Sequence, residues 1–337
     1  MAPSGDNSQP WSFSISGDSI MVHMHPEKDH ALLNVEDGGT LIASGAAIEN
    51  MLWEARAIGK EPSLELCPGP DRRDVARITL ATGGKNDEST ALSAIIPLRH
   101  TNRQPYQTTE LPKEFMKLLA RIEGEYSPCR LAVISGTNAV LKAARAASTM
   151  EEIALQDEQL HRLFFESITW SHEEHEAGKP GLHIKTLELP PPVRALFRLL
   201  KHWSVTSALN IFGFANLAAH SNAQVYASSG AMVAIIIPDR SPQSMLQAGR
   251  LTERIWLEAT RHTLVAQPLA GLIYLAAALK QNSSLINTKL GHKVRESDMI
   301  LHELAEAPGQ VIAMMLRVGI PLAPATARSR RMQPIIH

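Results

Sequence analysis

The chain has 337 residues, a length that corresponds to about two domains. Its 33 lysines and arginines against 34 aspartates and glutamates give a net charge of -1, which argues against a nucleic-acid-binding arm and a polybasic membrane face. Its two cysteines, Cys67 and Cys129, exclude a disulfide framework and a cysteine-rich zinc module. We therefore expect a cytoplasmic protein with no nucleic-acid partner and no membrane partner.

The first part of the chain predicts strands around one helix. A polar turn over residues 1–10 leads into a strand-like segment at 11–15, and a second strand is predicted at 19–25. Apolar residues at helical spacing predict a helix over 40–58, and a further strand is predicted at 75–80.

The remainder of the chain predicts a mixture of helices and strands. Residues 139–165 read as one long amphipathic helix, and residues 172–192, rich in glycine and proline, read as irregular. The other predicted elements are strands at 130–134, 231–237 and 310–318 and helices at 112–122, 245–260 and 268–280. This order predicts an α+β fold.

An eleven-residue helical segment occurs twice. The segment from Gly45 to Ala55 aligns with the segment from Gly249 to Ala259, 204 residues later, and Gly, Glu, Glu and Ala coincide. Two amphipathic helices can resemble each other by chance. The alternative is a duplicated fold in which the two central helices pack together as they would in a homodimer.

No standard catalytic motif is present. The chain has no Gly-x-Ser-x-Gly elbow, no Gly-x-Gly-x-x-Gly fingerprint and no Walker loop. His172 and His175 are three residues apart, whereas the zinc-helix motif places its histidines four apart. We therefore predict no metal site and name no catalytic residue.

Two basic clusters favour an anionic ligand. Arg99 and Arg103 flank His100 and Thr101, and two guanidinium groups at this spacing can converge on one phosphate. Arg330 and Arg331 form a second cluster in the C-terminal tail. A solvated basic turn and a tail that only aids solubility are the alternatives.

The N-terminal string is the most specific one in the chain. It combines Pro3, Ser4 and Asn7 with Gln9-Pro10-Trp11, so polar groups able to contact a planar ligand stand next to a proline that fixes the turn.

Together these strings resemble the FMN-dependent nitroreductase family, and most closely its internally duplicated (Acg-type) branch. The similarity runs from residue 1 to about residue 331, with a diverged middle at 131–228. It implies two nitroreductase-like α/β halves, each an antiparallel-rich sheet flanked by helices, packed as an intrachain pseudo-dimer. The first half would span residues 1–95 and be N-terminally short, lacking its leading helix and phosphate string. The second would span 96–337, with an insert at about 172–219 and a C-terminal tail.

The resemblance also implies the residues of an FMN site. Arg99, His100, Thr101 and Arg103 would hold the phosphate with Arg330 and Arg331. Pro3, Ser4 and Asn7 would border the flavin, and Gln267 and Leu269 lie where the family places the segment facing flavin N5. Only one complete set of parts is present, because the second half has no Pro-Ser-x-x-Asn turn, so one FMN per chain is expected.

The implied function is an oxidoreductase that passes hydride or electrons from NAD(P)H through FMN to a nitro, quinone or related small-molecule acceptor. The aromatic insert, which includes Phe197 and Trp203, also allows a protein that covers and sequesters its flavin. A third interpretation is the redox portion of a protein fused to an E1-like (ThiF-type) domain. The protein could be a monomeric pseudo-dimer or a homodimer.

Overall fold

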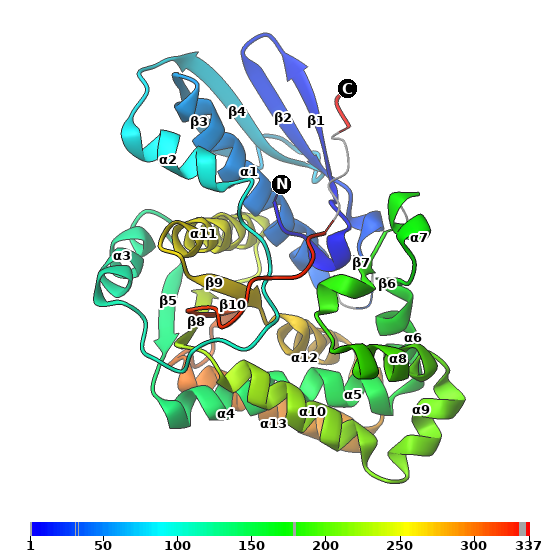
Figure 1. The fold of residues 1–337 in the computed structure, drawn as a ribbon. Helices are drawn as coiled ribbons and strands as arrows, with labels where there is room; N and C mark the ends of the chain where they lie inside the picture. The colour runs from blue at the N-terminus through cyan, green and yellow to red at the C-terminus, as the bar shows by residue number, and fades with distance from the viewer. Residues whose placement is uncertain (1, 31, 33, 178–179, 330–334) are drawn as a thin grey trace.

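The computed structural model describes residues 2–30, 32, 34–177, 180–329 and 335–337. It is an α+β structure, as the sequence predicts, with two antiparallel four-stranded sheets (Figure 1). Two long helices, α1 (Gly38–Ala57) and α11 (Pro242–Arg261), lie between the sheets. Among the described helices, none is long and apolar enough to cross a bilayer.

The first sheet has the strand order β1-β2-β4-β3. Gly17 at φ +58° and Asp18 form the two-residue turn that joins β1 to β2. Pro62 cannot donate a ladder hydrogen bond, and it lies on β3, which is an edge strand. The strands are β1 (Trp11–Ser16), β2 (Ser19–Met24), β3 (Lys60–Leu66) and β4 (Asp74–Thr82).

The second sheet repeats this topology. Its order is β5-β8-β10-β9, so in both sheets the chain visits positions one, two, four and three, with the long helix between the second and third strands. β8 is buried along its whole length because helices cover one face and α11 the other. The strands are β5 (Arg130–Ile134), β8 (Ala231–Ile237), β9 (Val265–Pro268) and β10 (Val311–Gly319).

The two copies of the sequence repeat lie on α1 and α11, which cross closely between the sheets. A Cβ atom added at Gly45 would lie 2.2 Å from the Leu246 carbonyl oxygen, and one added at Gly249 would lie 2.2 Å from the Ile42 carbonyl oxygen. Ile42 and Leu246 are themselves 204 residues apart. The aligned positions of the repeat therefore take equivalent places in the contact between α1 and α11, and a duplicated fold stays a prediction.

Helix α2 packs against α1 and α11, and the other remaining helices cover the second sheet and extend to one side of it (Figure 1). The prediction of a single helix over 139–165 is wrong, because Asp157 has an extended backbone and its side chain caps the amides of Gln159 and Leu160.

The segment 172–192, predicted as irregular, contains α7, β7 and a short 3-10 turn at Ile184–Leu187. The other elements are α2 (Asp87–Ile95), α3 (Lys113–Glu123), α4 (Thr137–Ala147), α5 (Thr149–Gln156), α6 (Glu158–Glu166), β6 (Ile168–Thr169), α7 (His172–Glu176), β7 (Leu182–His183), α8 (Pro191–Leu200), α9 (Trp203–Asn210), α10 (Phe214–Ala227), α12 (Gly271–Gln281) and α13 (Thr288–Leu304).

The two sheets exchange chain segments. The strand-like segment after α2 reaches the second sheet, where Thr101 forms a parallel bridge with Ala266 of β9. In the opposite direction, the chain end returns to the first sheet, where Phe13 of β1 donates its amide to the Ile335 carbonyl at 2.9 Å. A boundary between residues 95 and 96 stays a prediction.

Candidate functional site

A cavity of about 690 Å³ opens beside α1 and α11, where the exchanged segments meet. Its size is within the range of about 300–1,000 Å³ that is typical of small-molecule and cofactor sites. Eight stretches of chain contribute lining residues: the N-terminal turn (2–9), residues 29–34, α1, the string 99–103, residues 182–186, the α11–β9–α12 region, Met314 of β10 and the tail at 327–329. We refer to it as the first cavity.

The N-terminal turn is held by its own side chains. The Ser4 hydroxyl accepts a hydrogen bond from the Gln9 amide at 3.0 Å, and the Asn7 side-chain oxygen accepts one from the Gln9 side chain at 3.2 Å. Asp6 and Asn7 adopt positive φ values of 45° and 57°, a conformation that these residue types tolerate well. The turn therefore presents its polar groups to the first cavity in a fixed arrangement.

Arg99 is fixed by a buried carboxylate and an indole. Its Nε lies 3.1 Å from Glu253 Oε1, and its guanidinium stacks 4.5 Å from the Trp256 ring centroid. Burial raises the pKa of Glu253, while Arg99 and a hydrogen bond from Asn50 at 2.9 Å act to lower it. Glu253 and Trp256 therefore fix the position from which the Arg99 guanidinium contributes positive charge to the cavity.

Arg103 is tied to the insert and, through it, to the C-terminal tail. Its Nη1 donates to the Thr186 carbonyl at 2.9 Å, and its backbone amide donates to Glu188. The other carboxylate oxygen of Glu188 accepts the Thr326 amide at 2.7 Å. Glu188 therefore joins three segments of the cavity wall that are distant in sequence.

Two carboxyl groups balance the cations of the first cavity. Asp6 lines the cavity, and the removal of water by the protein around it, together with the nearby Asp29, raises its pKa to about 6. Burial also raises the pKa of Asp29, which accepts a hydrogen bond from Thr40. Arg103 acts on Asp6 in the opposite direction, so the two groups are close enough to influence each other.

One wall of the first cavity is made of small residues. Gly39, Ala43 and Ala46 of α1 lie along it, and Trp256 and Tyr274 contribute aromatic surface. Small side chains at this helical spacing leave a shallow face that admits a flat ring system, whereas the guanidinium groups suit a phosphate.

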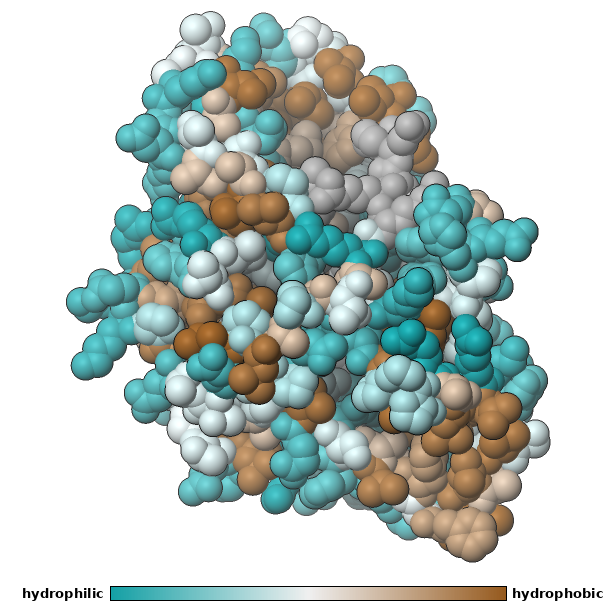
Figure 2. All heavy atoms as spheres, viewed as in Figure 1, coloured by the Kyte–Doolittle hydropathy of each residue, from teal (hydrophilic) through white to brown (hydrophobic). Residues whose placement is uncertain are grey.

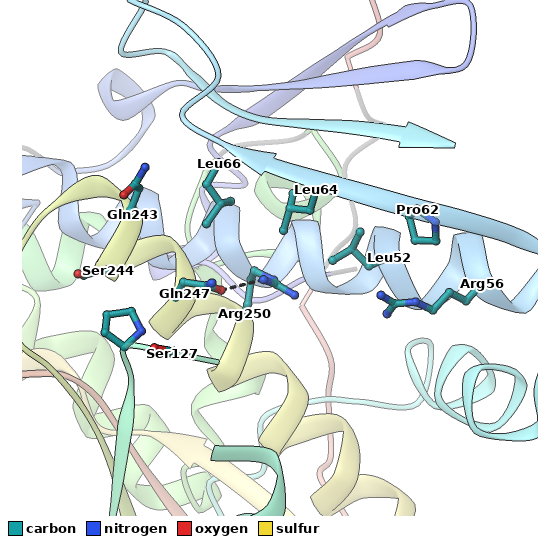
Figure 3. Close-up of a pocket in the computed structure, with 11 residues that line it drawn as sticks. Leu52, Arg56, Pro62, Leu64, Leu66, Ser127, Gln243, Ser244, Gln247 and Arg250 are labelled. Carbon is teal, nitrogen blue, oxygen red and sulfur yellow. Dashed lines mark hydrogen bonds between the residues drawn. The ribbon is translucent and has the colours of Figure 1, made fainter. Parts of the chain in front are cut away.

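A second cleft of about 540 Å³ lies where the repeat places the counterpart of the first cavity (Figure 3). Six of its lining residues are the 204-residue counterparts of six residues that line the first cavity: Leu52 for Trp256, Leu64 for Pro268, Leu66 for Ala270, Gln243 for Gly39, Gln247 for Ala43 and Arg250 for Ala46. Arg250 crosses this cleft, donating to Gln247 at 2.7 Å and to Glu49 at 3.0 Å. Long polar side chains thus fill the positions that are small in the first cavity.

Most of the predicted site residues come together. Pro3, Ser4, Asn7, Arg99, His100, Thr101 and Arg103 all line the first cavity. Gln267 and Leu269 are not among its described lining residues, although Pro268 between them is. Arg330 and Arg331 lie outside the described residues, and Arg328 of the same basic cluster lines the cavity.

The orientation of Gln267 has a clear cause. Its side chain accepts a hydrogen bond from Arg317 at 2.7 Å, below β9, where Arg317 is completely buried and stacks 4.0 Å from the Tyr106 ring centroid. Successive strand residues face opposite sides of a sheet, so Pro268 and Ala270 point to the cavity instead. Three further residues of the site were not predicted from the sequence. Asp6 occupies an unspecified position of the N-terminal string, and Trp256 and Glu188 lie outside the matched strings.

The first cavity fits FMN by the chemistry of its donors. Arg99, Arg103 and Arg328 supply cations for a phosphate, and the small-residue wall with Trp256 provides an apolar surface for a planar ring. In the second cleft, Gln247 and Arg250 occupy the corresponding space. The residues present therefore provide one such site in the part of the chain that the structure describes.

Comparison with known proteins gives distant relatives. No family model matches the sequence. Over 281 residues the chain is 25% identical to "Uncharacterized protein MT1398" of Mycobacterium tuberculosis, a match covering 82% of this chain and 38% of that protein. Over 120 residues it is 25% identical to "Putative NAD(P)H nitroreductase MT3217" of the same species, covering 35% of each. The matched part of the chain thus spans well under half the length of both relatives.

Among solved structures, the FMN-dependent nitroreductase NfnB from Mycobacterium smegmatis, in complex with NADPH, aligns with a TM-score of 0.39. The two sequences are 14% identical, and the alignment covers 73% of this chain and 100% of that chain.

Proposed function

We propose that this protein binds FMN in the first cavity and acts as an oxidoreductase of the nitroreductase type. One observation carries the proposal: guanidinium groups and a wall of small residues line the same cavity, and the strings that resemble the family meet there. The name of the relative MT3217, an NAD(P)H nitroreductase by description, favours NADH or NADPH as the electron donor.

Each segment of the site has a proposed role. Arg99, Arg103 and Arg328 bind the phosphate, and Arg330 and Arg331 extend this cluster. Thr101 and His100 lie between the first two arginines, where a hydroxyl and a ring nitrogen can donate to phosphate oxygens. His100 Nδ1 donates to the Leu98 carbonyl at 2.7 Å, so its Nε2 donates to a phosphate oxygen only when the ring is protonated.

The ring system would lie against α1 and the N-terminal turn. Pro3, Ser4 and Asn7 border it, and the backbone around Gln267 and Leu269 follows its edge. When bound, FMN supplies the redox chemistry, taking electrons from NAD(P)H and delivering them to a nitro, quinone or related acceptor. The chain's own contribution is to orient the cofactor and set the charge around it, and no side chain is assigned as a proton donor.

One FMN per chain is expected. The second cleft occupies the counterpart position, but Gln243, Gln247 and Arg250 fill it where the first cavity has Gly39, Ala43 and Ala46. This asymmetry supports an Acg-type pseudo-dimer in which one of two equivalent sites has been lost.

The test is a titration of the purified chain with FMN, followed by quenching of flavin fluorescence, with riboflavin as the control that lacks the phosphate. We expect saturation at one FMN per chain and weaker binding of riboflavin. Rapid mixing of the loaded protein with NADPH or NADH under anaerobic conditions should bleach the flavin absorbance. Failure to bind FMN would overturn the proposal.

Sequestration of a covered flavin is the second candidate function. Leu182 and Thr186 of the insert line the first cavity, and Glu188 ties this segment to the tail, so the insert could restrict access of a nicotinamide. Tight FMN binding without reduction by NADPH or NADH would favour sequestration. The third interpretation, a redox portion fused to an E1-like domain, would require adenylating activity in a longer product.

A further inference from the structure

An apolar surface with basic flanks covers α8, α9 and the turn into α10. Ile211 and Phe212 at the α9–α10 turn are 81% and 87% exposed, the highest values among the large hydrophobic residues. Val193, Leu196 and Leu199 of α8 and Leu217 of α10 are also exposed. Figure 2 shows apolar side chains gathered over these elements at the lower right of the view. We call this surface the α8–α10 face.

The α8–α10 face is the result of helix patterning. On α8, Phe197 and Leu200 turn toward an aromatic cluster with Phe165, while Leu196 and Leu199 face solvent. The helix is therefore apolar on two sides, and packing within the chain uses only one of them. Apolar exposure of this kind marks an interaction site.

The charged side chains that the segment 189–238 itself contributes to this face have one sign. Residues 189–238 contain no aspartate or glutamate, and their charged side chains are Arg194, Arg198 and Lys201. Arg198 and Lys201 are exposed at the end of α8, beside Leu199. Packed neighbours contribute acidic groups at two places: Glu158 and Glu166 of α6 border the hollow at Lys201 and Trp203, and Asp157 follows Leu155, whose carbonyl accepts the Asn210 side chain beside the α9–α10 turn.

We propose that the α8–α10 face docks on the surface of an anionic phospholipid bilayer. Basic side chains next to exposed apolar ones match such a surface, because the cations meet the headgroups while the apolar tips enter the acyl boundary. A symmetric contact between two copies would gather the cations of both copies in one interface, where residues 189–238 contribute no carboxylate to pair with them, so charge complementarity favours the bilayer over self-association. Docking of this kind lies in the interface and needs no spanning helix.

This inference goes beyond the proposed redox function and does not depend on it. It also departs from the expectation of no membrane partner, which came from the near-neutral charge of the whole chain. The net charge of the whole chain does not reflect residues 189–238, a segment of 50 residues in which no carboxylate offsets the cations.

Sedimentation of the full chain with lipid vesicles tests the proposal. We expect binding to vesicles of phosphatidylcholine mixed with phosphatidylglycerol, little binding to pure phosphatidylcholine, and loss of binding as salt is raised. The variants Ile211→Ser with Phe212→Ser, and Arg198→Gln with Lys201→Gln, should each weaken binding by on the order of tenfold.

Matched variants elsewhere on the surface serve as controls. Ile15→Ser with Ile58→Ser removes two exposed apolar side chains from the first half, and Lys113→Gln with Lys117→Gln removes two charges from α3. Both controls should bind vesicles like the wild type, and circular dichroism should show all four proteins folded. Equal binding to both vesicle types, no binding to either, or unchanged binding of the α8–α10 variants would overturn the proposal. So would a dimer that Phe212→Ser dissociates while vesicles remain unbound.

Discussion

Gly45 of α1 and Gly249 of α11 occupy the point where the two central helices come closest. A Cβ added to Gly45 would lie 3.0 Å from the Gly249 Cα and 2.2 Å from the Leu246 carbonyl oxygen, and the reciprocal clash involves the Ile42 carbonyl. The contact is thus made by backbone on both sides, which is why glycine stands at this position in both copies of the repeat.

Gly249→Ala should therefore destabilise the fold. The new methyl group would meet main-chain atoms that cannot move aside as a flexible side chain can, so we expect the free energy of unfolding to fall by about 1–3 kcal/mol or more. Urea denaturation would measure it. Gly69→Ala is the control, because nothing lies within 4 Å of a Cβ at Gly69; equal stability of both variants would contradict the close crossing.

Ala43→Gln should weaken FMN binding. Gln247 occupies the equivalent position in the second cleft (Figure 3), so a glutamine on α1 would project into the first cavity as its counterpart does. We expect FMN affinity to fall at least about tenfold, as expected when a side chain overfills a packed site. Flavin fluorescence measures it, and Gln247→Ala should keep one FMN per chain with unchanged affinity.

Arg328→Gln tests the phosphate contact with the least disturbance of the fold. Arg328 is exposed at the cavity rim and donates to the Pro97 carbonyl at 3.2 Å, whereas Arg99 compensates the buried charge of Glu253. Loss of one charge-assisted hydrogen bond, about 1.5–3 kcal/mol, predicts FMN binding weaker by about tenfold or more. Riboflavin affinity should not change, and Arg72→Gln, at a position 78% exposed, should change neither. A parallel loss for riboflavin would remove Arg328 from the phosphate site.

Asp6 predicts a pH dependence of FMN binding. Its pKa of about 6 means that its carboxyl becomes negative as pH rises through that value, and a negative group near Arg103 opposes a bound phosphate. FMN itself titrates in this range, so the informative quantity is the ratio of affinities between Asp6→Asn and the wild type. This ratio should be near one well below pH 6 and rise in favour of Asp6→Asn above it. A ratio that does not vary with pH would contradict the role of Asp6.

Glu188→Ala should loosen three walls of the cavity at once. The carboxylate accepts the amides of Arg103 and Thr326, and both amides should exchange hydrogen faster in the variant. We expect faster FMN dissociation, measured by stopped-flow displacement with excess riboflavin. Glu158→Ala, on exposed α6, is the control. Unchanged exchange at Thr326 would show that the tail is held by other contacts.

The sequence predicts the regular elements well where local pattern determines them. The predicted strands at 130–134 and 231–237 coincide with β5 and β8, and the helix at 40–58 differs from α1 by two residues at its start and one at its end. β3 escapes prediction because Pro62 and exposed polar residues interrupt the strand pattern, which only an edge position permits. The break at Asp157 also escapes, because capping competes with an uninterrupted amphipathic pattern.

The sequence motifs predict several residues that line the cavity, but they do not predict the contacts that hold its walls together. Arg99, Arg103, Ser4 and Asn7 are recognisable as motifs, and they do line one cavity. Glu188 offers no motif, because its role depends on bringing Arg103 and Thr326 together, 85 residues before it and 138 after it. The sequence also does not show which face of the sheet the Gln267 side chain is on, because that face depends on its hydrogen bond with Arg317 of the neighbouring strand β10.

The exchange of edge segments makes each half an incomplete protein. The segment that follows α2 carries Thr101 to β9 of the second sheet, and the C-terminal residues return to pair with Phe13 of the first sheet. If the chain were cut near residue 95, the first fragment would lose the C-terminal segment that pairs with Phe13, and each fragment would carry a central helix without its partner. Neither fragment should fold alone, and the two should regain structure by complementation when mixed. We therefore expect the chain to unfold as one cooperative unit, and neither half to fold when it is transplanted into another protein without the other.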